Sequence, residues 1–145
     1  MSGNIIARTH IEWLSLAHQG DKDAITYVNR SNAAVERHRV RFPIAYSQDD
    51  MQEEHKYWYQ KLADFLNKPI YATGSVLRGY WRSKDEEDAI SKKFNVPAKY
   101  SDFDVDSDNI TREELEKANK ELKPIADFSL AKWERKVLFI PNKKQ

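Results

Sequence analysis

Acidic and apolar residues alternate in the segment Asp102-Phe103-Asp104-Val105. Because successive side chains of a β-strand point to opposite faces, this pattern predicts a strand with one apolar face and one face that carries both carboxylates. Two carboxylates on one face repel each other unless solvent or a cation neutralises them. Mg²⁺ suits such a pair, because it binds one or two carboxylates together with phosphate oxygens of a substrate. The segment therefore predicts a strand at the border of the core and a candidate cation site.

Length and composition restrict the remaining possibilities. A chain of 145 residues with 40% hydrophobic residues is long enough for one domain with its own core. The absence of cysteine excludes a disulfide scaffold, a zinc–thiolate site, an iron–sulfur cluster and a cysteine nucleophile. The net charge of +1 lacks the basic excess that is typical of nucleic-acid-binding domains. Since the sequence has no apolar run of about 18 residues and no secretion signal, we expect a soluble, cytoplasmic protein without membrane contact.

The spacing of apolar residues predicts both helices and strands. Apolar residues at three- and four-residue intervals, with a boundary at Gly20 and Asp21, predict two helices near the N-terminus. Helices are predicted over residues 4–19, 22–38, 50–67 and 112–123, and a helix followed by a loop over residues 84–100. Strands are predicted over residues 69–73, 100–106, 125–130 and 136–140, and a short strand or a loop over residues 42–48.

A glycine–serine turn, Gly74-Ser75 followed by Arg78-Gly79, comes directly after the first of these strands. Glycine lets a backbone approach a phosphate closely, and backbone N–H groups between a strand and a helix can donate to phosphate oxygens. The hydroxyl of Ser75 and the guanidinium of Arg78 would add further donors. A phosphate-binding turn beside a carboxylate cation site is the combination that phosphoryl or nucleotidyl transfer requires.

In this order, the Gly74-Ser75 turn and the alternating segment from Asp102 resemble the motif of the nucleotidyltransferase superfamily, which includes DNA polymerase beta. The Gly-Ser-x-x-Arg-Gly turn is also similar to that of the minimal, antitoxin-type members of this superfamily. The resemblance covers residues 50–130 approximately. It implies an α/β (α+β) fold, in which helices flank a small mixed sheet.

The resemblance also implies a function. The chain would transfer a nucleotidyl group from a nucleoside triphosphate to an unidentified protein or RNA acceptor. Asp102 and Asp104 would hold Mg²⁺, or Mn²⁺ in its place. A third carboxylate is implied on the next strand, and Asp127 is the candidate to complete the metal site and to position or deprotonate the attacking hydroxyl. The glycine–serine turn would hold the β- and γ-phosphates, and Arg78 would assist it or brace it.

The chain departs from the family pattern in its spacing. Residues 76–101 separate the turn from Asp102, and this spacer of 26 residues is longer than is usual in the family. We therefore predict a helical extension over residues 1–49 and a nucleotidyltransferase-like core over residues 50–145, with an insertion at residues 82–99. The insertion, the small size and the lack of an acceptor-binding domain leave a second hypothesis open. In it, the chain is a catalytically silent interaction or structural module, with protein partners in a larger assembly.

The acidic segment allows two other interpretations. Asp102, Asp104 and Asp106 occupy positions 1, 3 and 5 of an EF-hand-like loop. Glu113 falls at position 12, although Ser107 replaces the glycine of the sharp turn. A calcium loop would make Glu113 essential and the glycine–serine turn irrelevant. The other interpretation is a solvated acidic loop beside an ordinary turn.

Aromatic residues after the turn also have two possible roles. Tyr80 or Trp81 could stack on a nucleobase, although core packing is the commoner role of such rings. Trp58 is predicted in the core and Trp133 as a partly buried anchor. The four histidines are predicted as core or surface residues rather than as metal ligands.

Overall fold

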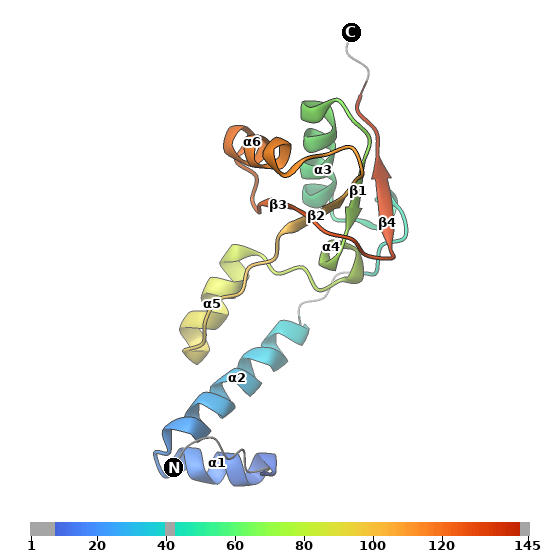
Figure 1. Cartoon of the computed structure of the whole chain (residues 1–145). Coiled ribbons are helices and arrows are strands. Elements are labelled where there is room, and N and C mark those ends of the chain that lie inside the picture. The colour runs from blue at the N-terminus through green and yellow to red at the C-terminus, as the bar shows by residue number, and fades with distance from the viewer. Residues whose placement is uncertain (1–7, 40–42, 143–145) are drawn as a thin grey trace. The chain divides into compact units, whose positions relative to one another are not determined.

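The computed structural model describes residues 8–39 and 43–142 of the chain. Within these residues the chain is a mixed α/β protein with six α-helices and one four-stranded mixed sheet, which confirms the predicted fold class (Figure 1). The first residues of the predicted segments 4–19 and 42–48 lie outside the described residues. No helix in the described ranges is both long and apolar enough to pass through a membrane.

The described chain divides into two compact units. The first unit joins the residues up to Arg39 with Asp88–Ala98, which come from within the predicted insertion. The second unit joins the residues from Pro43 to Glu87 with those from Lys99 to Asn142, and it contains the whole sheet. All the site residues predicted from the sequence belong to this second unit.

The first unit contains α1 (His10–His18) and α2 (Lys22–Arg39). Helix α1 begins with a capping box, in which the side chains of Thr9 and Glu12 each accept a hydrogen bond from the other residue's backbone N–H. The rings of Trp13 and Tyr27 stack 4.9 Å apart and join the two helices. Over their described residues, both predicted N-terminal helices are confirmed.

The sheet of the second unit has the strand order β3-β2-β1-β4 (Figure 1). The strands are β1 (Ile70–Thr73), β2 (Phe103–Asp106), β3 (Phe128–Leu130) and β4 (Lys136–Phe139). Strand β1 pairs antiparallel with β2 and β4, whereas β2 pairs parallel with β3. Each strand lies inside a segment that was predicted as a strand. The alternation in β2 buries Phe103 and Val105 completely, as the sequence pattern predicts.

The remaining helices are α3 (Glu53–Leu66), α4 (Ser75–Arg78), α5 (Lys84–Phe94) and α6 (Arg112–Leu122), preceded by a 3-10 turn, η1 (Gln48–Asp50). Helices α3 and α6 contribute Leu62 and Leu115 to the hydrophobic core of the second unit. Residues 43–47 form a loop before η1, so the described part of the segment 42–48 is not a strand. Helix α5 continues into the first unit, where Lys93 Nζ lies 3.6 Å from the Glu36 carboxylate.

Aromatic side chains fix the backbone of β2 from the core side. Tyr59 of α3 is fully buried, with its ring 5.3 Å from that of Phe103. Trp81 packs in the core, with its ring stacked 5.1 Å from that of Phe103. Of the two roles considered for Trp81, core packing is therefore confirmed. The Tyr59 hydroxyl donates a 2.8 Å hydrogen bond to the backbone carbonyl of Asp104, and the Trp81 indole donates one of 3.2 Å to that of Asp102. The core therefore positions the backbone at both predicted metal ligands.

Hydrogen bonds close the base of the predicted insertion. The backbone N–H of Arg82 donates to the Ser101 hydroxyl at 2.9 Å, and the backbone N–H of Ser101 donates to the Arg82 carbonyl at 3.0 Å. The buried carboxylate of Glu87 accepts a hydrogen bond of 2.8 Å from the backbone N–H of Lys99. The chain thus leaves and re-enters the second unit at one place, so the additional residues between α4 and β2 do not displace β2 from the sheet.

Burial of His55 predicts a loss of stability in mild acid. His55 lies on α3, and its ring contacts those of Trp81 and Phe103. Burial lowers the pKa of His55 to about 4. The unfolded chain gains a proton near pH 6.5 that the folded chain gains only near pH 4, so the free energy of unfolding falls as the pH falls through this window. We expect the free energy of unfolding to fall by up to about 3 kcal/mol, with most of the decrease reached near pH 4.

Urea denaturation of the wild type and of His55→Gln across this pH range measures the effect. Because glutamine does not titrate, the free energy of unfolding of the variant should fall less steeply between about pH 6.5 and pH 4.5. Parallel curves for the two proteins would show that His55 is not the source of the pH dependence.

Candidate functional site

Gly74 joins β1 to α4 and lies beside the carboxylate of Asp104. The antiparallel register pairs Thr73, the last residue of β1, with Asp104 of β2, so the next residue of the chain meets the Asp104 side chain. A Cβ on Gly74 would overlap this carboxylate, at 2.9 Å from its Cγ. Gly74 also has φ 83° and ψ −148°, a backbone conformation that residues with a Cβ rarely adopt. Two independent constraints therefore require glycine at the predicted turn.

The structure brings Asp102 and Asp104 together on the side of β2 that faces away from the core. Burial raises the pKa of Asp104, and the negative charge of Asp102 raises it further. A hydrogen bond from Trp133 and the positive charge of Arg78 act in the opposite direction. The pair of carboxylates thus lies near Arg78 and Gly74, two residues of the predicted phosphate turn. Ser75, the third of these residues, is half-buried and begins α4.

Asp127 does not join this pair in a metal-binding group. It is exposed and precedes β3 by one residue, and its backbone carbonyl accepts a hydrogen bond of 2.8 Å from Phe103. The group on β3 that reaches Asp102 is the hydroxyl of Ser129, whose Oγ lies 3.0 Å from Asp102 Oδ2. Among the described residues, no three histidine or acidic side chains form a group that could hold a metal ion. The roles assigned to Asp127 stay predictions.

Asp106, at the end of β2, forms an ion pair with a lysine. Its buried carboxylate lies 2.8 Å from Nζ of Lys136 on β4. This contact raises the pKa of Lys136, which keeps the lysine charged. Asp104 and Asp106 lie on a strand, whereas an EF-hand holds its ligands on a loop between two helices. The calcium-loop interpretation is therefore wrong, and the solvated-loop interpretation is wrong for Asp104 and Asp106. Asp102, which precedes β2, is exposed.

A pocket of about 880 Å³ opens beside Gly74. It is lined by Ile44, Gly74, Arg78, Tyr80, Asp106, Lys132, Trp133, Glu134, Arg135 and Lys136. The guanidinium carbon of Arg78 lies 4.5 Å from the centre of the Trp133 ring, in a cation–π contact. The pocket has the size of a small-molecule site. Its basic and aromatic side chains suit a ligand that carries both phosphates and a planar ring.

Residues 132–136 contribute half of this lining, although no sequence pattern predicted it. They connect β3 to β4, and the hydroxyl of Thr73 donates a hydrogen bond of 2.6 Å to the backbone carbonyl of Arg135. Basic residues surround Trp133 in the sequence, which is a visible signal for an anionic ligand. The basic residues indicate a pocket only once the pairing of β4 with β1 is known, because this pairing brings residues 132–136 beside the turn at Gly74. Trp133, predicted as a partly buried anchor, is 46% exposed and forms a wall of the pocket.

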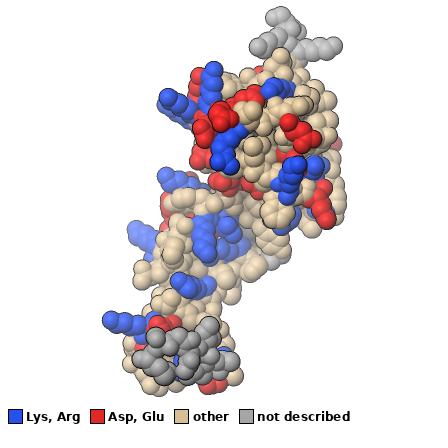
Figure 2. Space-filling model, in the orientation of Figure 1, with Lys and Arg blue, Asp and Glu red and all other residues tan. Residues whose placement is uncertain are grey.

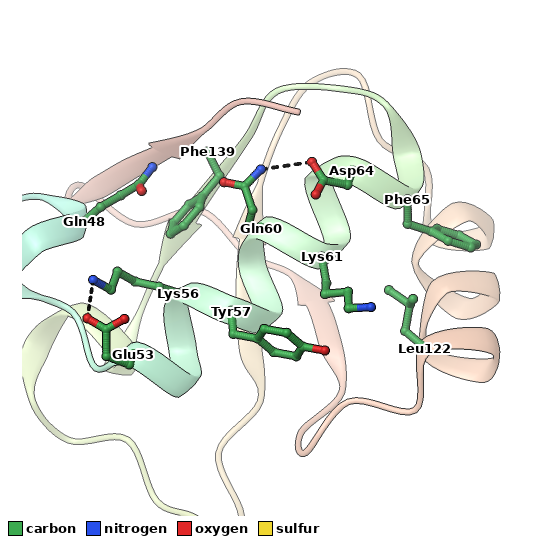
Figure 3. Close-up of a pocket in the computed structure, with 10 residues that line it drawn as sticks. All are labelled: Gln48, Glu53, Lys56, Tyr57, Gln60, Lys61, Asp64, Phe65, Leu122 and Phe139. Carbon is green, nitrogen blue, oxygen red and sulfur yellow. Dashed lines mark hydrogen bonds and ion pairs between the residues drawn. The ribbon is translucent and has the colours of Figure 1, made fainter. Parts of the chain in front are cut away.

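Another pocket, of about 740 Å³, lies over α3 and contains none of the predicted site residues (Figure 3). Its polar side chains bind one another: Lys56 Nζ lies 2.6 Å from Glu53, and Gln60 donates to Asp64 at 3.0 Å (Figure 3). Gln60 also donates to the backbone carbonyl of Ile140 at 2.8 Å, just beyond β4. Because the pocket over α3 lacks the predicted phosphate turn, the pocket beside Gly74, which contains Gly74 and Arg78, is the better candidate.

Basic and acidic side chains are interspersed on the face seen in Figure 2. This distribution agrees with the net charge of +1. An anionic ligand would therefore be recognised by the local arrangement of charges in a pocket rather than by a broad basic surface.

No family model, curated protein or solved structure matches the chain. The nucleotidyltransferase hypothesis thus depends on the motif residues and on how they lie relative to one another.

Proposed function

We propose that the chain transfers a nucleotidyl group from a nucleoside triphosphate to an acceptor hydroxyl at the pocket beside Gly74. One observation carries this proposal: Gly74 lies against the carboxylate of Asp104 and also lines a pocket with four basic side chains. The turn and the acidic segment are separated by 26 residues in the sequence, so their contact is not a local consequence of the chain. The resemblance to the nucleotidyltransferase superfamily supports the same assignment.

The donors at Asp102 and Asp104 fit a hard divalent cation. Carboxylate oxygens are the ligands that Mg²⁺ and Mn²⁺ prefer. Burial and the charge of Asp102 raise the pKa of Asp104, and a cation held by the pair would offset both effects. Phosphate oxygens of the substrate would supply further ligands. A bound Mg²⁺ supplies positive charge to the triphosphate and to the departing pyrophosphate.

The transfer replaces a phosphoanhydride linkage of the triphosphate by a phosphoester linkage to the acceptor. The acceptor hydroxyl oxygen forms a bond to the α-phosphorus, and the bond from this phosphorus to the bridging oxygen of pyrophosphate breaks. The hydroxyl proton passes to a base, and we assign this role to Asp127. Arg78 and Lys136 line the pocket and provide positive charge for the β- and γ-phosphates, with Lys136 oriented by its ion pair with Asp106.

The second hypothesis, a catalytically silent module, is favoured by contacts that both carboxylates already make. Asp102 accepts a hydrogen bond from Ser129, and Asp104 accepts one from Trp133. In this alternative the acidic residues connect β2 to β3 and to the segment before β4, and the chain is a structural part of a larger assembly.

Thermal unfolding in the presence of each nucleoside triphosphate and Mg²⁺ tests the proposal. A nucleotide at about 100 times its Kd should stabilise the folded chain by about 2.7 kcal/mol and raise Tm by roughly 5–10 °C. The shift should require both nucleotide and cation, and it should disappear when Asp102 and Asp104 are replaced together by asparagine. As a matched control, Glu116→Gln with Glu121→Gln removes two exposed acidic side chains of α6 and should retain the shift. A chain that no nucleotide stabilises would contradict the proposal.

A further inference from the structure

Two arginine–aromatic pairs flank the pocket beside Gly74. The guanidinium carbon of Arg78 lies 4.5 Å from the centre of the Trp133 ring, and that of Arg135 lies 4.3 Å from the centre of the Tyr46 ring. Tyr46 and Trp133 are 70% and 46% exposed, so neither ring is part of the core. Both arginines and Trp133 line the pocket, whereas Tyr46 lies beyond Arg135, outside the lining. The Tyr46–Arg135 pair therefore extends the binding surface past the pocket itself.

We propose that the Tyr46–Arg135 pair stacks on the terminal base of a single-stranded oligonucleotide, which is the acceptor in the transfer. This inference rests on the proposed function, because it assigns the nucleoside triphosphate to the pocket and the acceptor strand to its rim. Nucleobases stack on aromatic rings and on guanidinium planes, and the pair presents both. Lys132 lines the same pocket and supplies positive charge for the phosphates of the strand.

The chemistry of the rim favours an oligonucleotide over a protein acceptor. The lining has four basic side chains and two acidic ones, and one of the acidic ones, Asp106, is neutralised by Lys136. The centre of a protein–protein interface is typically depleted of charged residues. Six of the ten residues that line this pocket are charged. Exposed aromatic rings among basic groups are instead typical of surfaces that bind single strands.

The backbone at Tyr46 is held independently of the ring. The backbone N–H of Ala45 donates to the carbonyl of Leu77 on α4 at 2.8 Å, and that of Tyr46 donates to the Asp50 carboxylate at 2.9 Å. Neither hydrogen bond involves the aromatic side chain. The substitution Tyr46→Ala therefore removes the stacking surface and leaves the segment in place.

Fluorescence anisotropy with short, labelled oligo(U) RNA and oligo(dT) DNA tests the inference. The wild-type chain should bind an oligonucleotide with an affinity that falls as the salt concentration rises. Tyr46→Ala should weaken this binding by about 5- to 150-fold, the effect of one lost stacking contact. Tyr57→Ala is the matched control. Like Tyr46, Tyr57 is exposed and has a cationic side chain, Lys61, over its ring, but it lines the pocket over α3. This control should bind the oligonucleotides like the wild type. The affinities for the RNA and the DNA probe show which of the two is preferred.

Nucleotide-dependent thermal stabilisation of the same proteins separates this inference from the proposed function. If a nucleoside triphosphate stabilises the chain but neither oligonucleotide binds, the acceptor assignment is overturned and the nucleotide pocket stands. Equal affinity of the wild type and Tyr46→Ala for the oligonucleotides also overturns the assignment. Transfer of the nucleotidyl group of a labelled nucleoside triphosphate to a protein instead of an oligonucleotide would overturn it as well. If neither nucleotide nor oligonucleotide binds, both proposals fail.

Discussion

Replacement of Asp102 and Asp104 together by asparagine should lower nucleotidyl transfer at least about 100-fold. The amides keep the size of the side chains and remove the negative charge, so the variant should not bind the divalent cation that the proposed transfer requires. Bound cations contribute several kcal/mol of transition-state stabilisation, and about 1.4 kcal/mol corresponds to a factor of ten in rate. Transfer of labelled nucleotide from an α-labelled triphosphate measures this loss, with Glu116→Gln and Glu121→Gln again as the control pair.

The same double variant should be at least as stable as the wild type without ligand. Because the pKa of Asp104 is raised, the folded chain binds this proton more tightly than the unfolded chain does. Above the raised pKa, the charged carboxylate therefore destabilises the folded state, and a neutral amide removes that cost. The buried side of β2, with Phe103 and Val105, is unchanged by the substitutions. If the double variant unfolded instead, its loss of activity would not be evidence for the metal site. Unfolding would also contradict the prediction that the charged carboxylate of Asp104 destabilises the folded state.

Alanine at Gly74 should destabilise the fold and also disturb the site. The backbone conformation alone costs about 1–3 kcal/mol for a residue with a Cβ. The Cβ would in addition displace the Asp104 carboxylate, which it overlaps. Urea denaturation and nucleotide-dependent thermal shifts measure the two effects, and Gly74→Ala should lose the thermal shift.

Gly20→Ala separates these two contributions. Gly20 also has a positive φ of 88°, but a Cβ there meets nothing within 4 Å. This control should show a conformational cost alone and should retain the nucleotide-dependent shift. Equal losses of stability in the two variants, with nucleotide binding retained in both, would contradict the close approach of Gly74 to Asp104.

The elements that could be predicted from the sequence are those with a clear local signal. The period of two at residues 102–105 identified β2 and its buried face, because one face of the strand packs on the core and the other does not. Helix α6 begins at Arg112, the first residue of the helix predicted over residues 112–123, and Thr111 and Glu114 form a capping box there. The turn after β1 was also a local prediction, and Gly74 has a backbone conformation there that favours glycine.

Neighbouring aromatic residues could not be assigned from the sequence with the same success. Trp58 was predicted in the core, but it is half-buried at the margin, and the adjacent Tyr59 is the residue that is fully buried. Similarly, Trp81 is buried while Tyr80 lines the pocket. For Trp58 and Tyr59, which both lie on α3, a rotation of about 100° between successive helical residues decides which ring is buried, and the apolar pattern around the pair does not fix that rotation.

Contacts between distant segments were beyond prediction. The ion pair of Asp106 with Lys136 and the pocket wall at residues 132–136 depend on the pairing of β1 with both β2 and β4. The association of Asp88–Ala98 with the N-terminal helices likewise joins parts of the chain that share no sequence signal. Long-range pairing of this kind is set by the whole fold rather than by local propensity.

The most direct measurement is the position of Mn²⁺ in a crystal of the chain with a non-hydrolysable nucleoside triphosphate, located by anomalous scattering. The account predicts a peak bound by the carboxylates of Asp102 and Asp104, with the triphosphate directed along Gly74 towards Arg78 and Lys136. A nucleotide bound at the pocket over α3, or a pocket beside Gly74 that stays free of both nucleotide and Mn²⁺ at saturating concentrations, would contradict it.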